Sequence, residues 1–335
     1  MKKIYLYVAV TVVALVALAF WWAVRDMNTI LEQPLALQSP VIFTVSHGAS
    51  VKKISRQLAS RGWMSRPYYL VIEARRRGLA ANIKAGEYRL KPGITPRGVL
   101  KLIVTGKVVQ YALTIPEGWT FTQIMGAVLE NSILKHTLDN AAEDYVMAQL
   151  GHAGEAAEGR FFPDTYHFPR GTTDVGFLRR AYDTMSRILE EEWQGRDMGL
   201  PYNSSYQALI MASIIEKETA IPEERARIAG VFVRRLQQGM LLQTDPTVIY
   251  AMGRNFDGDI RSRDLALASP FNTYINKGLP PTPIASPGRA SIHAALHPDG
   301  GSALYFVATG DGHHYFSDTL EEHNRAVAKY QLHGK

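Results

Sequence analysis

An apolar stretch at the N-terminus restricts the fold of this chain more than any other feature of its sequence. Two lysines precede an almost uncharged segment, Ile4–Val24, and an Arg-Asp pair closes it. A helix of that length rises about 1.5 Å per residue and spans about 30 Å, the thickness of a bilayer hydrocarbon core. Trp21 and Trp22 stand where aromatic side chains gather at a membrane interface. Residues 1–25 are therefore predicted to form a cytoplasmic tip and a transmembrane helix.

A cleaved signal peptide is the alternative reading of the same segment, because Ala17-Leu18-Ala19 resembles a cleavage site. The anchor is favoured since the apolar stretch continues past that site. Lys2 and Lys3 favour a cytoplasmic N-terminus, and no second spanning segment follows in the sequence. The prediction is a single-pass protein of the inner (cytoplasmic) membrane, with its remaining residues in the periplasm or on the outer side.

Composition removes several classes of function. The chain has no cysteine, which excludes disulfides, thiolate zinc sites and a cysteine nucleophile. Its net charge of +6 suits nucleic acid, an anionic membrane surface or an acidic polymer equally well. No run of lysines and arginines is long enough to act as a nucleic-acid arm, and no phosphate-binding or dinucleotide motif occurs. We therefore predict no nucleic-acid partner and no cofactor.

The rest of the chain is predicted to be an α+β protein with two folded parts. Residues 26–40 are polar and contain proline, as a linker would. Residues 41–108 alternate helical and strand patterns, and the strand, Gly-Ala-Ser turn and amphipathic helix of Thr44–Leu58 resemble a LysM module, a small unit that binds N-acetylglucosamine polymers. Residues 109–335 form the larger predicted domain, which ends in a hairpin across Gly310-Asp311-Gly312.

One glutamate in the larger domain combines an apolar setting with a helix end. At helical spacing, Ile214, Ile215 and Glu218 fall within about 60° of one another, whereas Glu216 lies roughly 160° from Glu218. Ile221-Pro222 breaks the helix shortly afterwards. The negative end of the helix dipole and apolar neighbours both disfavour an ionised carboxylate. A carboxylic acid with a raised pKa is what protonation of a glycosidic oxygen requires. Periodicity alone leaves open a solvated end of a core helix.

Two further segments mix polar and aromatic residues. Gln243, Thr244 and Asp245 have side chains that suit sugar hydroxyls, although Asp-Pro equally suits a turn or a helix cap. Asn272 and Tyr274 stand in a Pro/Gly-rich stretch that is predicted to be an ordered loop lining a cleft. These residues are candidates for substrate binding or for support of the site.

The pair His293 and His297 has the i, i+4 spacing of zinc ligands on a helix. No glutamate follows His293, and Pro298 ends the segment. The sequence therefore predicts no metal site.

Five segments together resemble the YceG-like family of endolytic murein transglycosylases (MltG). They are Glu158-Gly159-Arg160-Phe161-Phe162-Pro163-Asp164-Thr165-Tyr166, Ala212–Thr219, Gln243–Tyr250, Asn272-Thr273-Tyr274 with Gly278–Ile284, and Tyr305-Phe306-Val307 with His314 and Phe316.

The resemblance implies a membrane-anchored lyase that cuts peptidoglycan glycan strands. Members cleave the β-1,4 bond between N-acetylmuramic acid and N-acetylglucosamine within a strand and leave a 1,6-anhydromuramyl end. The second glutamate of the family's E-K-E-T motif, here Glu218, is the expected acid and base. Glu216 is expected to orient it or to bind sugar, as are the polar residues of the two mixed segments. Peptidoglycan synthases are candidate partners. A non-catalytic peptidoglycan-binding scaffold and a muramidase that uses Glu218 with Asp245 or Asp164 are the alternatives.

Overall fold

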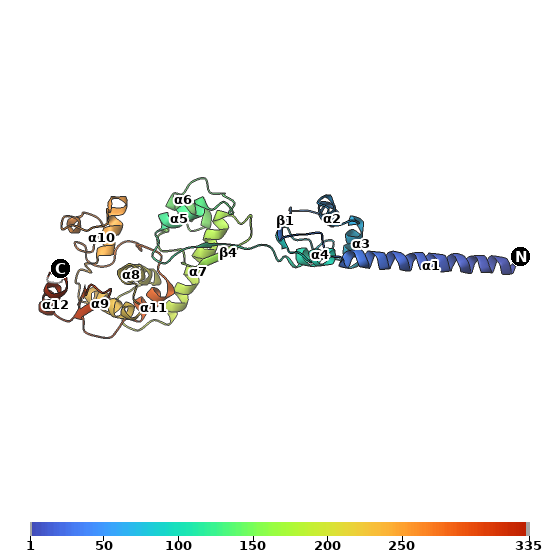
Figure 1. Cartoon of the computed structure of the whole chain (residues 1–335). Coiled ribbons are helices and arrows are strands. Elements are labelled where there is room, and N and C mark those ends of the chain that lie inside the picture. The colour runs from blue at the N-terminus through green and yellow to red at the C-terminus, as the bar shows by residue number, and fades with distance from the viewer. Residues whose placement is uncertain (1, 333–335) are drawn as a thin grey trace. The chain divides into compact units, whose positions relative to one another are not determined.

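The structure is a computed structural model and describes residues 2–332. It divides into two compact units (Figure 1): the chain up to Tyr111 together with Phe168–Arg170, and Ala112–His167 together with the residues from Gly171 onward. Helices and three two-stranded sheets occur in the described part of the chain, which confirms the α+β prediction.

Helix α1 spans Lys2–Glu32 and is long and apolar enough to cross a membrane. It differs from the sequence prediction at its C-terminal end, where a linker over residues 26–40 was expected. The helix continues through Glu32 because Met27 and Leu31 are buried in the hydrophobic core of the first unit. The Asp26 carboxylate also accepts hydrogen bonds from Arg66 and Tyr69. Tertiary packing therefore converts the first part of the predicted linker into helix.

The remainder of the first unit is a small α+β module. Its elements are β1 (Val41–Val45), α2 (Val51–Ser60), α3 (Pro67–Arg76), β2 (Gly86–Leu90) and α4 (Pro96–Thr105). The two strands pair antiparallel, with Phe43 opposite Tyr88. Both rings are fully buried against the helices, together with Leu58 of α2. The first strand and helix lie where the sequence predicted them, while the likeness to a LysM module and its carbohydrate-binding role stay predictions.

The second unit is mostly helical. Its elements are β3 (Tyr111–Thr114, which begins in the first unit), α5 (Phe121–Glu130), α6 (Glu143–Leu150), β4 (Thr165–Phe168), α7 (Asp174–Gln194), α8 (Ser205–Glu218), η1 (Pro222–Glu224), α9 (Arg225–Gln237), α10 (Asp245–Met252), η2 (Gly253–Asn255), η3 (Asp264–Ala266), α11 (Arg289–Leu296), β5 (Tyr305–Ala308), β6 (His314–Ser317), α12 (Leu320–Val327) and the π-helical η4 (Ala328–Leu332).

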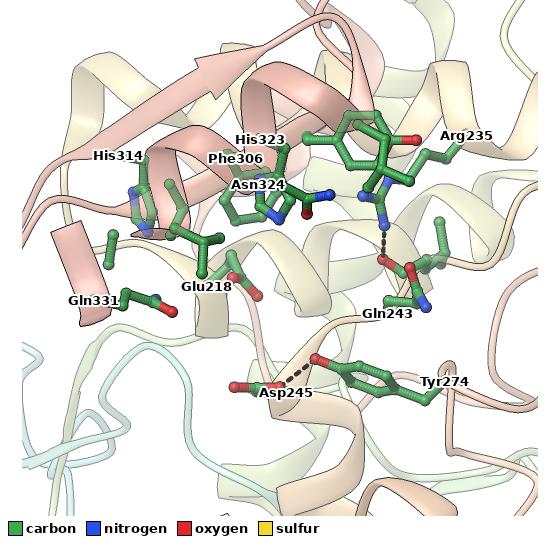
Figure 2. Close-up of a pocket in the computed structure, with 16 residues that line it drawn as sticks. Glu218, Arg235, Gln243, Asp245, Tyr274, Phe306, His314, His323, Asn324 and Gln331 are labelled. Carbon is green, nitrogen blue, oxygen red and sulfur yellow. Dashed lines mark hydrogen bonds between the residues drawn. The ribbon is translucent and has the colours of Figure 1, made fainter. Parts of the chain in front are cut away.

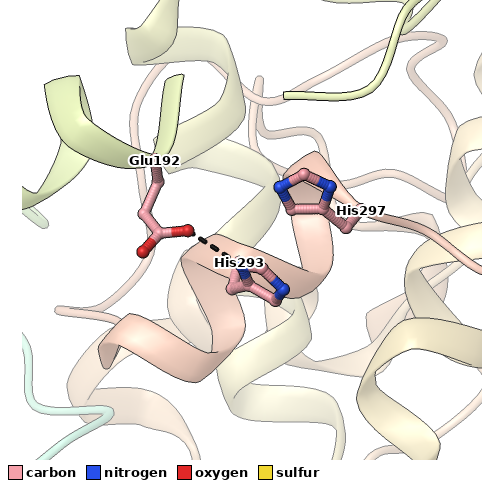
Figure 3. A group of neighbouring side chains, drawn as sticks. All are labelled: Glu192, His293 and His297. Carbon is pink, nitrogen blue, oxygen red and sulfur yellow. Dashed lines mark hydrogen bonds and ion pairs between the residues drawn. The ribbon is translucent and has the colours of Figure 1, made fainter. Parts of the chain in front are cut away.

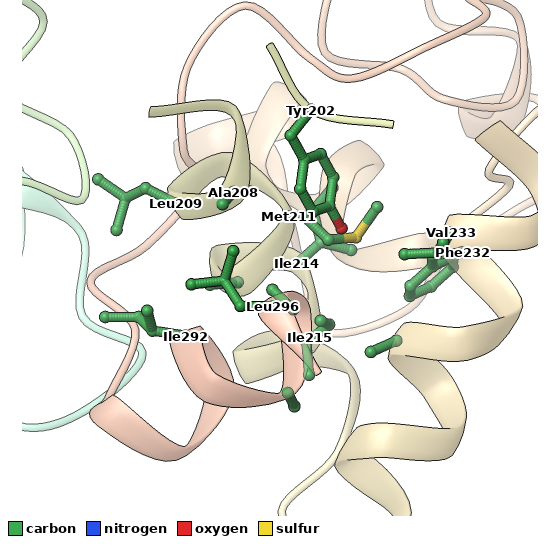
Figure 4. Close-up of a cluster of buried hydrophobic side chains, with 14 of the residues drawn as sticks. Tyr202, Ala208, Leu209, Met211, Ile214, Ile215, Phe232, Val233, Ile292 and Leu296 are labelled. Atoms are coloured by element: carbon green, nitrogen blue, oxygen red, sulfur yellow. The ribbon is translucent and has the colours of Figure 1, made fainter. Parts of the chain in front are cut away.

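Helix α8 lies at the centre of this unit. Every residue from Ala208 to Ile215 is buried, and the helix packs against α7, α9, α10 and α11. A helix that is apolar on all sides belongs inside a core. Figure 4 shows its side chains between Phe232 and Val233 of α9 and Ile292 and Leu296 of α11. The packing fixes α8, and with it the position of the helix end that carries Glu218.

The C-terminal hairpin forms where the sequence predicted it. Strands β5 and β6 pair antiparallel, and their register places Phe306 opposite Phe316 and Ala308 opposite His314. Helix α12 then packs against both strands. This hairpin and the helix after it form one wall of the site described next.

Candidate active site

Glu218 is the last residue of α8 and faces a cavity of about 510 Å³. The helix ends here because Thr219 adopts an extended backbone conformation, and Pro222 begins the next helical turn. The cavity is lined by residues from α8, the start of α10, the loop at Tyr274, the β5–β6 hairpin and α12. Figure 2 shows Glu218 within this set, with His314 on one side and Asp245 and Tyr274 on another.

Burial raises the pKa of the Glu218 carboxyl above its ordinary value, and the negative charge of Asp245 acts in the same direction. Three neighbours oppose the shift: the Thr244 hydroxyl, His314 and Arg235. The Thr244 Oγ1 donates a hydrogen bond of 2.6 Å to Glu218 Oε2. The net direction agrees with the sequence expectation of a carboxyl whose protonated form is favoured.

The segment that carries Gln243 and Thr244 is held in a strained conformation. Gln243 has a φ of 52°, a left-handed value that is uncommon for a residue with a side chain. The loop containing Thr273 holds it in place, because Gln243 N donates to Thr273 O (3.1 Å) and Thr244 N donates to Thr273 Oγ1 (3.1 Å). Such strain persists where surrounding contacts enforce it, as at many functional sites. Here it brings the Thr244 hydroxyl to Glu218.

Asp245 and Tyr274 form a pair on the cavity wall. The Tyr274 hydroxyl donates a hydrogen bond of 2.6 Å to Asp245 Oδ1, and both residues line the cavity. Burial raises the pKa of Tyr274, as does its bond to Asp245, so the phenol stays a donor. Gln243, Asp245 and Tyr274, all predicted from sequence, therefore share one cavity with Glu218.

Glu216 and Asn272 lie outside this cavity. Glu216 Oε2 accepts hydrogen bonds from Gly288 N (3.0 Å) and Ser291 Oγ (2.7 Å), which ties α8 to the start of α11. Asn272 is buried, and its side-chain amide donates to the carbonyl oxygens of residues 265 and 267. Its Oδ1 accepts from Tyr274 N (2.9 Å). Both residues support the elements around the cavity, and neither is available to a ligand there.

His314 is a cavity residue for which residue spacing gave no role. Its Nδ1 lies 2.7 Å from Glu224 Oε2, and its backbone N–H donates to Glu224 Oε1 (3.0 Å). Burial by itself would raise the pKa of Glu224. The hydrogen bonds from His314 act in the opposite direction, and the net pKa is lowered. The ionised carboxylate assigns the Nδ1 proton to the histidine, which leaves Nε2 for a bound molecule.

Aromatic and cationic side chains complete the wall. The rings of Tyr305 and His323 stack at 5.3 Å, and burial lowers the pKa of His323. Its buried Nδ1 has no hydrogen-bond partner among the described residues. The Arg235 guanidinium donates to Leu242 O (2.8 Å) and Leu304 O (2.7 Å), joining two sides of the cavity. Only the family motif that contains Tyr305 pointed to this wall; the sequence held no signal for Arg235, Glu224 or His323.

The arrangement suits acid chemistry on a polar, ring-shaped ligand. A carboxyl with a raised pKa, two neighbouring hydroxyl groups and several aromatic faces meet in one open cavity. Asp164, a candidate partner carboxylate, does not line it.

Comparison with known proteins gives consistent matches. The model of the YceG-like family matches residues 43–329. A Bacillus subtilis (strain 168) protein named endolytic murein transglycosylase is 34% identical over 271 residues, covering 75% of this chain and 74% of that protein. A Streptococcus pneumoniae (strain D39) protein of the same name is 28% identical over 320 residues, covering 85% of this chain and 57% of that protein. A crystal structure of a yceG-like protein from Listeria monocytogenes has a TM-score of 0.54 and 31% identity, covering 86% of this chain and 99% of that one.

Proposed function

The chain belongs to the YceG-like family, and on that premise we propose that it is an endolytic murein transglycosylase with Glu218 as its acid and base. It cleaves the β-1,4 bond between N-acetylmuramic acid and N-acetylglucosamine inside a peptidoglycan glycan strand. The observation that carries the proposal is a carboxyl with a raised pKa at the end of a rigid core helix, facing an open cavity. The names of the relatives support the reaction class.

The proposed reaction needs one carboxyl group and no water. Glu218 begins protonated and gives its proton to the glycosidic oxygen, so that the bond from that oxygen to C1 of the muramyl sugar breaks. The ionised Glu218 then takes the proton of the muramyl 6-hydroxyl, whose oxygen bonds to C1. The products are a free 4-hydroxyl and a 1,6-anhydro ring, and Glu218 is again protonated. The raised pKa favours the first half of this cycle.

Neighbouring residues serve the second half of the cycle. The Thr244 hydroxyl donates to Glu218 Oε2 and stabilises the carboxylate while it acts as a base. His314, with its Nδ1 held by Glu224, contributes in the same direction. Gln243 and the Asp245–Tyr274 pair bind sugar hydroxyls along the cavity wall. Glu216 and Asn272 act as supports, since their hydrogen bonds hold α11 and the Tyr274 loop in place.

A muramidase is the second candidate, because Asp245 lines the same cavity as Glu218. A glycoside hydrolase normally uses a pair of carboxyl groups, one as acid and one as base or nucleophile. Tyr274 occupies one oxygen of Asp245 with a 2.6 Å hydrogen bond, which suits binding better than attack. The lyase is therefore preferred. The two reactions leave different ends, so products distinguish them.

Location follows from α1. We infer a single-pass protein of the inner membrane with its N-terminus in the cytoplasm, since Lys2 and Lys3 precede the apolar span. The catalytic unit then lies outside the cytoplasm, where peptidoglycan is assembled. Its substrate is proposed to be nascent strands close to the membrane, with peptidoglycan synthases as neighbours.

The test is mass spectrometry of the products released from purified glycan strands by the full chain in detergent. We expect anhydromuramyl ends with the wild type and none with Glu218→Gln. Glu216→Gln is the matched control: it removes a charge from the same helix outside the cavity and keeps an oxygen that accepts both hydrogen bonds, so it should cleave. Reducing ends would establish the hydrolase, and no cleavage by any form would favour a non-catalytic scaffold.

A further inference from the structure

A second cluster of polar side chains lies away from the cavity, where α7 meets α11. Glu192 stands in the last turn of α7, and His293 and His297 belong to α11 and its C-terminal cap. One potential ligand atom from each of the three residues lies within 4.8 Å of the others. Figure 3 shows Glu192 reaching from α7 toward the side of α11 that carries both histidines. The carboxylate that the sequence lacked after His293 is therefore supplied by another helix.

The two histidines keep their helical spacing at the end of α11. His297 N donates to His293 O at 2.8 Å, so the last turn of the helix is intact. The two rings lie 4.3 Å apart with an angle of 34° between their planes. Imidazoles one helical turn apart on the same face can bind a single ion, as they do in helical zinc motifs.

Neighbouring residues orient each of these side chains. Asp197 Oδ1 lies 2.8 Å from His297 Nδ1, which leaves Nε2 of that ring as a free ligand atom. The backbone N–H of Asp197 donates to Leu296 O (3.0 Å), which holds the residue beside α11. Arg289 Nε donates to Glu192 Oε1 (2.7 Å), while Glu192 Oε2 faces His293 Nδ1 at 2.8 Å. Carboxylates that fix histidine rings in this way are typical of metal sites.

We propose that Glu192, His293 and His297 bind a divalent transition-metal ion, with Zn²⁺ as the ion to test. The ligands are one carboxylate oxygen and two imidazole nitrogens, a set that Zn²⁺ accepts, and three protein ligands leave a fourth position for water. The ion takes the place of the hydrogen between Glu192 Oε2 and His293 Nδ1, and the neutral His293 ring then carries its hydrogen on Nε2. It ties α7 to α11, the helix that Glu216 also joins to α8.

The experiment is calorimetric titration of the full chain in detergent with Zn²⁺, after treatment with a chelator. We expect one ion bound per chain and a rise in melting temperature. Substituting both histidines, His293→Ala with His297→Ala, should abolish this binding. His167→Ala removes an exposed histidine of the same unit and should leave binding unchanged.

Asp197→Asn gives an independent measurement that keeps all three ligands. Loss of the carboxylate behind His297 should weaken Zn²⁺ binding about 10- to 100-fold. Co²⁺ in place of Zn²⁺ should give visible absorption bands in the wild type that disappear in the double-histidine variant. Circular dichroism shows whether each variant is folded. The proposal is overturned if the wild type shows no saturable binding, or if the folded double variant binds Zn²⁺ with the same affinity.

Discussion

Burial raises the pKa of both Glu158 and Glu218 in the second unit, yet only Glu218 lines the cavity. Glu158 is 5% exposed and its pKa rises to about 7. It accepts hydrogen bonds from Phe121 N (2.9 Å) and the Tyr250 hydroxyl (3.1 Å). Glu218 also has a raised pKa, but it lines the 510 Å³ cavity. The pKa is therefore raised in both glutamates, but only Glu218 is accessible to a ligand in the cavity.

The difference shows what each carboxyl contributes. Glu158 bonds to Phe121 of α5 and to Tyr250 of α10, so it joins the start of α5 to α10. At Glu218 a single hydroxyl occupies one oxygen, and the other oxygen has no protein hydrogen bond among the described residues. A carboxyl with a free oxygen at a cavity can exchange a proton with a ligand, whereas an enclosed one affects mainly stability.

The largest expected effect separates the two residues by activity. Glu218→Gln should lower kcat/KM about 10²- to 10⁴-fold, because general acid and base catalysis contributes that much. Glu158→Gln should keep cleavage within a few-fold of wild type at a temperature where it is folded. Steady-state release of anhydromuramyl products measures both. Equal losses of activity in folded Glu218→Gln and folded Glu158→Gln would contradict the different roles assigned to the two glutamates.

The next effect concerns stability and pH. The folded pKa of Glu158, about 7, exceeds the ordinary value of 4.5, so the folded chain holds its proton more tightly than the unfolded chain does. The stabilisation is complete below about pH 4.5 and is lost as the pH rises through 7, up to about 3 kcal/mol in all. Glu158→Gln should remove this component from the pH dependence of the unfolding free energy. Urea denaturation between pH 4.5 and 8 measures the unfolding free energy of both proteins. The same pH dependence in the wild type and in Glu158→Gln would contradict the conclusion that the enclosed Glu158 carboxyl affects stability.

A smaller effect is expected at His314. Loss of its ring should lower kcat/KM about tenfold, the size of one hydrogen bond to a charged group. His314→Asn is the sharper variant, because its amide can still reach Glu224 but places nothing at the position of Nε2. We expect His314→Asn and His314→Ala to lose activity equally. If the asparagine variant were fully active, His314 would serve only to hold Glu224.

The smallest effect is a shift in a pH profile. The Thr244 hydroxyl lowers the Glu218 pKa, so Thr244→Val should raise it further. The basic limb of the profile of kcat/KM against pH, where the acid form of Glu218 is lost, should then move to higher pH. Thr165→Val, at an exposed threonine elsewhere in the unit, is the control. A basic limb that stays in place would mean that the Thr244 bond does not tune Glu218.

Much of the fold was readable from local patterns. The β5–β6 hairpin and the end of α8 at Glu218 follow from turn residues and from the helix break before Pro222, which act within a few positions of the chain. Helix α1 extends into the predicted linker, where Met27 and Leu31 pack into the core of the first unit. The sequence of residues 26–40 has the polar, proline-containing pattern of a linker, and it does not reveal the long-range contacts that its first residues make.

The candidate site shows the same difference between what local patterns predict and what long-range contacts decide. Periodicity placed Glu218 and Glu216 on different faces of α8, and the structure agrees: one lines the cavity and the other bonds to α11. Polar residue types alone grouped Asn272 with Tyr274, although the first is buried in the loop and the second lines the cavity. Residue type predicts what a side chain can bond to, but not which partner it meets.

The sequence by itself determined the apolar N-terminal span, the α+β character and the placement of a glutamate at the end of an apolar helix, because these depend on composition and on spacing along one element. Only the tertiary structure decided which side chains surround that glutamate. Thr244 reaches Glu218 from 26 residues away, Glu224 meets His314 from 90 residues away, and Glu192 meets His293 from 101 residues away. Such contacts form when separate helices pack into one core, and no local pattern of residues encodes them.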